Sequence, residues 1–309
     1  MKRMFGTAAV LLTASLALAA CGGGGSGGGN PLDTTSAAPS GSASASGGGK
    51  VIIGSANFDE NTLLASIYAQ ALQSKGVQVE EKPNIGTREV IYDQVKSGGL
   101  TVVPEYNGNL LAFVDKETKA KTTDEVNAGL KEKLPPELEV LDSSPAEDKD
   151  TLTISKDTQA KQSLNTMDDL AKVSKTMVIG APAEFKKRWE AELKSVYGIE
   201  FKDWKATGAT TADAIKDGTV QVGNVFSTDP KIAANNLVSL QDTKNLFAAQ
   251  NVTPLVNKAA VNDTVKTTLN AISAKLTTQS LLDMMQKIAV NKDEPATVAK
   301  EWLTSNGLG

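Results

Sequence analysis

The chain has 309 residues, and its 32 basic and 36 acidic residues give a net charge of −4 at pH 7. This charge argues against a nucleic-acid partner, because nucleic acids select basic surfaces. The chain has no histidine and a single cysteine, Cys21. This composition excludes Ser-His-Asp and Cys-His catalysis, His or Cys metal sites and internal disulfides. Carboxylate chemistry, oxygen-ligand metals and plain ligand binding remain.

The first residues have the layout of a secretory signal. A basic start precedes an uncharged apolar run over 4–20, which ends in small residues directly before Cys21. Because a cysteine after Leu-Ala-Ala looks like a bacterial lipobox, we expect 1–20 to be removed and Cys21 to carry lipid. The mature protein would then be extracytoplasmic and lipid-anchored to the cell membrane. The alternatives are an ordinary signal peptide with an incidental cysteine and a short transmembrane helix, although the run is short for a bilayer span.

The segment that follows, up to residue 49, is almost entirely Gly, Ser and Ala. Such a composition buries too little apolar surface to offset the entropy of ordering. We therefore expect 21–49 to be the lipidated cysteine and a flexible tether, with an r.m.s. reach on the order of 30 Å. The folded part is then 50–309, a length that suits one large domain or two intertwined lobes.

The first folded section alternates predicted strands and helices, the pattern of a parallel α/β sheet. Strands are predicted over 51–55, 77–81, 100–103 and 138–141. Helices are predicted after Asn57, after an N-cap at Thr87, and over 122–134.

The pattern restarts after a strand at 151–154. Predicted strands then cover 176–180, 201–205, 220–226, 236–242 and 252–257, and predicted helices cover 167–173, 183–197 and 211–216. Three helices fill the tail. We expect an α/β protein of two lobes joined by two crossover segments, with lobe 1 formed by 50–153 and 253–309 and lobe 2 by 154–252. Two crossovers make a hinge, and a hinge between lobes makes a cleft.

Three stretches of the first section resemble the substrate-binding lipoproteins of osmoprotectant ABC transporters of the ProX/OpuC type. They are 53–60 (IGSANFDE), 85–90 (IGTREV) and 104–109 (PEYNGN). Further matches follow in the same order, namely Glu184-Phe185 with Arg188, Tyr197-Gly198, 226–229 (FSTD), and Phe247 with 254–256. The resemblance implies a type II periplasmic-binding-protein fold closing on a small solute such as glycine betaine, carnitine or choline. It also implies an ABC permease as partner, a monomer, and no cofactor or metal.

In this family a quaternary ammonium group sits among aromatic faces, and hydrogen-bond donors hold any ligand carboxylate. The resemblance implies that Tyr106 and Phe226 belong to the cage and that Thr87 donates to a ligand oxygen. Other candidate binding residues follow predicted strands or lie near the expected cleft, where α/β sheets place ligands: Asn57, Phe58, Asn107, Asn109, Ser227, Thr228 and Gln250.

Three departures from the family pattern keep other readings open. Ala56 stands where relatives often carry Lys, Gln250 stands where they often carry Tyr, and Asp150-Thr151-Leu152 stands where they place an aromatic residue at the lobe crossover. The same fold binding a neutral, aromatic or polyhydroxylated solute is therefore one alternative. A glycoside hydrolase using Glu105, Glu184 or Asp229 is another. We expect no enzyme, because no activated nucleophile or metal cluster accompanies these carboxylates. A sensory or adhesive lipoprotein is a third alternative.

Overall fold

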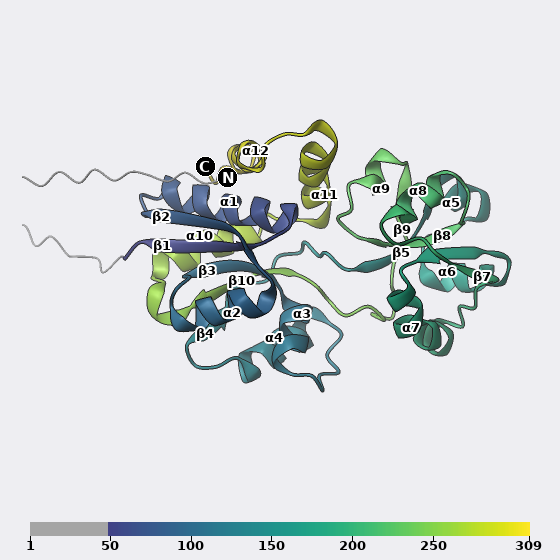
Figure 1. Ribbon diagram of the computed structural model, residues 1–309, viewed down its shortest axis with the longest axis horizontal. Coiled ribbons are helices and arrows are strands. Elements are labelled where there is room, and N and C mark those ends of the chain that lie inside the picture. Colours follow the sequence, from purple (N-terminus) through teal and green to yellow (C-terminus); the bar gives the residue numbers. More distant parts are fainter. Residues whose placement is uncertain (1–48) are drawn as a thin grey trace, which may run out of the picture. The chain divides into compact units, whose positions relative to one another are not determined.

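The computed structural model describes residues 49–309 (Figure 1). The predicted signal peptide, the lipidation site Cys21 and nearly all of the predicted tether lie outside the described residues. Within residues 49–309, no helix combines the length and the apolar character that crossing a membrane requires.

The first lobe is built on a five-stranded sheet with the strand order β2-β1-β3-β10-β4. Its strands are β1 (Val51–Ala56), β2 (Val79–Gly86), β3 (Val102–Tyr106), β4 (Leu138–Val140) and β10 (Val252–Asn257). Strand β1 runs parallel to β2 and β3, whereas β10 runs antiparallel to β3 and β4. Because β10 comes from far along the sequence, the chain leaves this lobe after β4 and returns to it.

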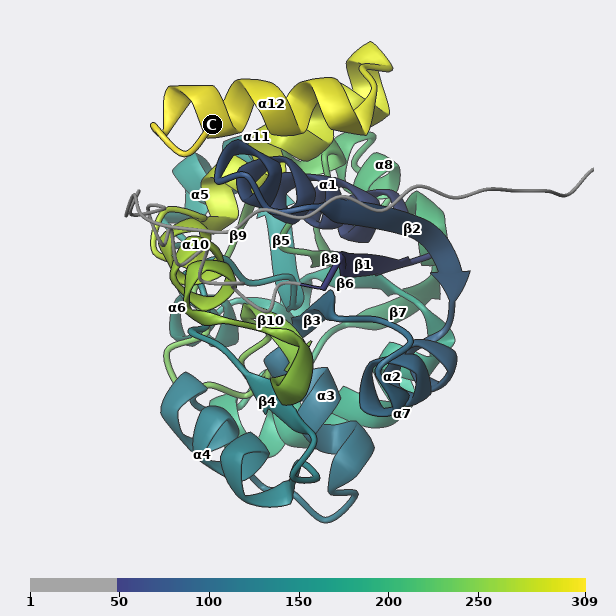
Figure 2. The same ribbon diagram turned by 90° about the vertical axis from the view of Figure 1, so that its left-hand side faces the viewer.

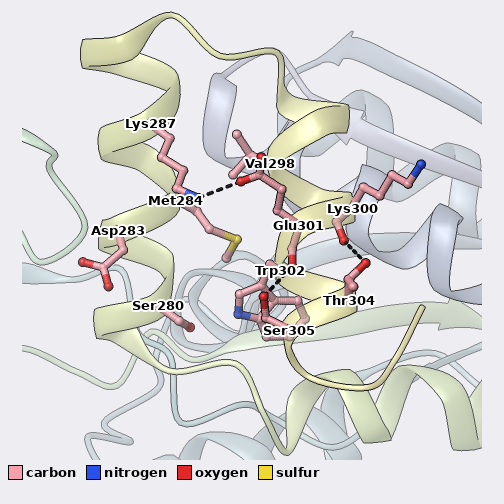
Figure 3. A pocket seen from close by; sticks show the side chains of 10 residues that line it. All are labelled: Ser280, Asp283, Met284, Lys287, Val298, Lys300, Glu301, Trp302, Thr304 and Ser305. Atoms are coloured by element: carbon pink, nitrogen blue, oxygen red, sulfur yellow. Dashed lines mark hydrogen bonds and ion pairs between the residues drawn. The ribbon is translucent and has the colours of Figure 1, made fainter.

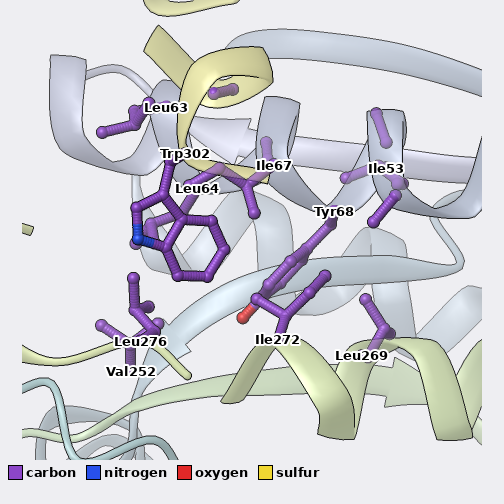
Figure 4. Close-up of a cluster of buried hydrophobic side chains, with 14 of the residues drawn as sticks. Ile53, Leu63, Leu64, Ile67, Tyr68, Val252, Leu269, Ile272, Leu276 and Trp302 are labelled. Carbon is purple, nitrogen blue, oxygen red and sulfur yellow. The ribbon is translucent and has the colours of Figure 1, made fainter. Parts of the chain in front are cut away.

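Seven helices accompany this sheet in the described chain. They are α1 (Asp59–Ser74), α2 (Arg88–Ser97), α3 (Asn107–Val114), α4 (Thr123–Lys133), α10 (Asp263–Ser273), α11 (Thr278–Gln286) and α12 (Pro295–Ser305). Helix α1 is the most buried, since its apolar residues cover more than one face: Leu63, Leu64 and Ile67 are fully buried. Figure 4 shows these side chains in one cluster with Ile272 of α10 and Trp302 of α12, so the tail helices close the core of the first lobe.

The second lobe repeats the same plan with the strand order β7-β6-β8-β5-β9. Its strands are β5 (Asp150–Ser155), β6 (Val178–Ala181), β7 (Asp203–Ala206), β8 (Val222–Phe226) and β9 (Leu237–Ser239). Its helices are α5 (Lys156–Gln162), α6 (Met167–Ala171), α7 (Ala183–Glu192), α8 (Thr211–Lys216) and α9 (Lys231–Ala234), with a π-helical turn over Leu193–Tyr197. Strand β5 is antiparallel to β8 and β9, while β6 is parallel to β7 and β8.

The two-lobed α/β fold predicted from the sequence is confirmed. In each sheet the antiparallel fourth strand, β10 or β5, is the one that follows a connection from the other lobe. The two connections, 141–149 and 240–251, pair with each other at a bridge between Glu147 and Asn251. They run side by side, as a hinge requires.

The lobe boundary lies earlier than the predicted division at 153/154. All of β5 pairs within the second sheet, and Leu152 and Ile154 are fully buried in the second lobe. The strand begins and ends with polar residues, Asp150 and Ser155, and its pairing with β8 and β9 places it in the second lobe. The strand β3 extends through Tyr106, beyond the predicted end at residue 103, and α3 begins directly after it at Asn107.

Candidate functional site

A cavity of about 290 Å³ draws on both lobes and on both connections. Its lining residues are Asn109, Asp148, Lys149, Asp150, Pro182, Phe185, Arg188, Trp189, Asn224, Phe226, Phe247, Ala248 and Gln250. Asn109 comes from α3 of the first lobe, while most of the remaining wall comes from the second lobe. We call this space the interlobe cavity.

Four aromatic side chains line the interlobe cavity. Phe185 and Trp189 stand one turn apart on α7, so they share a face of the helix. Phe247 packs against both, with ring centroids 5.9 Å from Phe185 and 5.1 Å from Trp189, the latter edge to face. Phe226, at the end of β8, is 55% exposed. Aromatic faces of this kind attract a cation once water is excluded.

Charges of both signs lie in the same wall. The nearest contact between Arg188 and Asp150, Nη1 to Oδ2, is long at 3.9 Å, and the Arg188 side chain is 62% exposed. Asp150 is held instead by the Asn224 amide, which donates to its Oδ1 at 3.0 Å. The Arg188 guanidinium therefore retains donors for an incoming anion. A wall with rings, carboxylates and a lightly engaged guanidinium suits a ligand that carries both charges.

A smaller cavity of about 140 Å³ lies in the first lobe, around the carboxyl ends of β1, β2 and β3. It brings together four predicted site residues, Asn57, Phe58, Thr87 and Tyr106. The Phe58 and Tyr106 rings stack at an angle of 28°, with centroids 6.2 Å apart. Thr87 is the N-cap residue of α2, as predicted, but its side chain accepts no bond from the helix N-terminus.

An ion pair fixes the back of this smaller cavity. Arg88 donates to Glu105 twice, from Nε to Oε1 at 2.8 Å and from Nη2 to Oε2 at 2.9 Å. Glu105 Oε2 also accepts the backbone N–H of Tyr106 at 2.9 Å. Because the fork of Arg88 is engaged in this bidentate pair, it contributes little free positive charge to the cavity.

Two carboxyl groups interact near Tyr106, the buried one of Glu60 and the half-buried one of Asp148. The Tyr106 hydroxyl donates to Glu60 Oε1 at 2.5 Å, and the Thr228 hydroxyl donates to Asp148 Oδ1 at 2.7 Å. Burial, and next the negative charge of Asp148, raise the pKa of Glu60 to about 7, and burial also raises the pKa of Asp148. Because the Tyr106 hydroxyl donates to Glu60, only the Tyr106 ring is available to a ligand.

Three predicted site residues brace the connections instead of lining a cavity. Asn107 is fully buried, and its Oδ1 accepts the backbone N–H groups of Gly108 and Asn251, each at 2.8 Å. Ser227 donates to the Glu147 carbonyl at 2.7 Å, and Thr228 donates to Asp148 as described above. These polar groups satisfy buried backbone and carboxyl atoms, as an interior requires.

The last two predicted residues join α3 to the second connection at the edge of the interlobe cavity. The backbone N–H of Asn109 donates to Gln250 Oε1 at 2.9 Å, and Gln250 Nε2 donates to Asn109 Oδ1 at 3.1 Å. Sequence reasoning named neither the acidic residues of this cavity nor Trp189 as binding residues. A signal existed, since Phe185 and Trp189 have i, i+4 spacing on a helix that directly follows a strand.

A larger cavity, of about 660 Å³, lies between α11 and α12 and contains none of the predicted residues (Figure 3). Met284 and Trp302 form its apolar part, and Lys287 pairs with Glu301 at 2.7 Å across its upper end. Its walls belong to the first lobe alone, so a movement of one lobe against the other would not enclose a ligand there.

Comparisons with known proteins agree with this architecture. A family model described as the substrate-binding domain of the ABC-type glycine betaine transport system matches residues 49–305. The glycine betaine-binding protein YehZ of Escherichia coli is 28% identical over 276 residues, covering 83% of this chain and 90% of that protein. The carnitine transport binding protein OpuCC of Listeria monocytogenes is 25% identical over 264 residues, covering 82% of this chain and 86% of that protein. A crystal structure described as a glycine betaine/carnitine/choline ABC transporter shares the fold, with a TM-score of 0.78 and 23% identity over 84% of this chain and 99% of that one.

Proposed function

Because the chain belongs to the family of substrate-binding domains of ABC-type glycine betaine transport systems, we propose that it captures a zwitterionic quaternary ammonium solute, such as glycine betaine or carnitine. In this proposal it acts outside the cytoplasm, held by lipid on Cys21, and hands the solute to an ABC permease. The family is one of transport binding proteins rather than enzymes, so hydrolysis by Glu105, Glu184 or Asp229 is not proposed.

The composition of the interlobe cavity is the observation that carries this proposal. Its rings and carboxylates attract a quaternary ammonium, and Arg188 has free donors for a carboxylate. Of the two predicted cage residues, Phe226 lines the interlobe cavity together with the rings of Phe185, Trp189 and Phe247, whereas Tyr106 lines the smaller cavity of the first lobe. A ligand held by both lobes favours the arrangement in which both touch it, which is how binding drives closure.

The test compares ligands that differ in one charge. Glycine betaine and carnitine have a carboxylate, whereas choline has none. We expect Arg188→Gln to weaken binding of the two zwitterions by roughly tenfold or more, since a charge-assisted pair contributes about 1.5–3 kcal/mol. Choline binding should change less than about threefold. Titration calorimetry measures all three, and Lys187→Gln, an exposed neighbour on the same helix, is the matched control. Equal losses for all three ligands would contradict the assignment of Arg188.

A second candidate is a neutral, aromatic or polyhydroxylated solute. The amides of Asn109, Asn224 and Gln250 in the cavity wall favour it, because they offer hydrogen bonds without charge. The same titrations therefore include sugars and polyphenols. Binding of such a compound, with no heat from any quaternary amine, would replace the first candidate with the second.

A further inference from the structure

Helix α11 joins the hydrophobic cores of both lobes. Leu281, Met284 and Met285 pack into the core of the first lobe, together with α1 and α12. Leu282, the next residue along from Leu281, packs into a cluster of the second lobe that includes Ile215, Ile232 and Leu237. Leu282 is only 8% exposed. A single nine-residue helix therefore links the lobes at a place where the chain itself does not cross.

The first lobe holds α11 firmly. Figure 3 shows Met284 of α11 facing Trp302 of α12. The start of the helix is also tied to the first connection, since the Ala146 N–H donates to the Leu276 carbonyl at 3.1 Å and the Glu147 N–H donates to Thr278 Oγ1 at 3.0 Å. If the lobes rotate about their connections, α11 moves with the first lobe. Leu282 must then slide within, or leave, its site in the second lobe.

The contact exists in an arrangement that leaves ligand-facing rings uncovered. Phe58 is 44% exposed and Phe226 is 55% exposed, although the proposed function needs such rings to enclose a cation. Leu282 does not line the interlobe cavity, and most of its cluster comes from α8, α9 and β9, which provide none of the cavity residues. Strand β8 alone contributes to both, with Val225 in the cluster and Asn224 and Phe226 in the cavity wall. The Leu282 contact and the ligand contacts are therefore separate, and each acts on the same movement.

We propose that the packing of Leu282 against the second lobe stabilises the ligand-free arrangement and thereby weakens apparent ligand affinity. We call this contact the latch. This inference rests on the proposed function, in which the lobes close on a ligand. A ligand that binds only the closed form has an apparent Kd equal to its intrinsic Kd divided by the closed fraction. Weakening the latch raises that fraction, so a substitution that touches no ligand tightens binding.

The test measures lobe arrangement and affinity separately. The full chain with Cys21→Ser carries no other cysteine, so spin labels placed at Glu117→Cys in the first lobe and Lys187→Cys in the second report the distance between the lobes. Without ligand, Leu282→Ala should shift this distance toward the value of the ligand-bound protein. The Kd for glycine betaine should fall between about threefold and thirtyfold. An unchanged distance distribution, or a weaker affinity, overturns the latch.

Control variants separate the latch from general destabilisation. Leu269→Ala truncates a fully buried leucine that packs only in the first lobe, so it should lower stability without shifting the distance. Leu282→Met keeps the apolar volume and should behave like the wild type. Ile232→Val removes one methyl from the opposite wall and should shift the distance in the same direction as Leu282→Ala, by less. If no quaternary amine binds, the proposed function fails, while the ligand-free distances still decide whether the latch exists.

Discussion

The buried carboxyl of Glu60 should make the stability of the protein depend on pH between about 4.5 and 7, although the chain has no histidine. Its pKa rises from an ordinary 4.5 to about 7, chiefly through burial. Between these values the folded state binds more protons than the unfolded state, so stability falls as pH rises. At about 1.36 kcal/mol per pH unit, the interval corresponds to roughly 3 kcal/mol of unfolding free energy lost between pH 4.5 and pH 7.

Glu60→Gln removes this titration while keeping the shape of the side chain. The amide oxygen still accepts from the Tyr106 hydroxyl, and no charge is forced into the interior. Relative to the wild type, the variant should gain up to about 3 kcal/mol between pH 5 and pH 8. The assay is urea unfolding at several pH values. The chain has no histidine to add a slope of its own in this range.

Asp148 remains in the variant, and its raised pKa, due first to burial, leaves a residual slope of the same sign in both proteins. Glu301→Gln, an exposed side chain paired with Lys287, is the control and should follow the wild-type curve. Parallel curves for the wild type and Glu60→Gln from pH 5 to pH 7.5 would show that the pKa of Glu60 is not raised in the folded state.

The other predictions concern the residues that brace the connections and the exposed ring. Asn107→Ala should lower the unfolding free energy by about 3 kcal/mol, because it leaves the buried N–H groups of Gly108 and Asn251 without a hydrogen-bond acceptor. In the same urea experiment, the unfolding free energy of the control Asn109→Ala should stay within about 0.5 kcal/mol of the wild type, since Asn109 is exposed. Gly108→Ala should lower Tm by about 5 °C, since its new Cβ would stand 2.1 Å from the Ala249 carbonyl oxygen; Gly49→Ala, which meets nothing within 4 Å, should leave Tm unchanged by calorimetry. Phe226→Ala should weaken glycine betaine binding by about tenfold with no loss of Tm, because its ring is mostly exposed; a stable variant with unchanged Kd would remove Phe226 from the site.

Local sequence patterns predicted most of the strands and longer helices. The spacing of Leu63, Leu64 and Ile67 identified α1, and the helix ending at Gly198 ends there because that glycine takes a φ of 74°, which other residues rarely adopt. The two-lobe architecture followed from a pattern that starts twice, together with the family resemblance. The first lobe boundary was misplaced because β5 begins and ends with polar residues, so its pairing partners, and not its own sequence, decide its lobe.

The candidate site was harder to predict because long-range contacts assign the roles of its side chains. Asn107 and Asn109 look alike in the sequence, yet Asn107 meets Asn251, 144 positions away, inside the protein. Asp148 and Asp150 come near aromatic rings only when the first connection is placed beside α7 and β8. Three residues at the ends of strands, Asn57, Phe58 and Thr87, lie in the smaller cavity of the first lobe together with Tyr106, the last residue of β3.

The most direct measurement is a titration of the wild-type chain with glycine betaine. Binding is monitored both by calorimetry and by tryptophan emission, because Trp189 lines the interlobe cavity. We expect saturable binding with a change in emission that Trp189→Phe abolishes. Binding without any contribution from Trp189 would place the ligand elsewhere. No binding of glycine betaine, carnitine or choline would contradict the proposal that this receptor carries a quaternary ammonium solute.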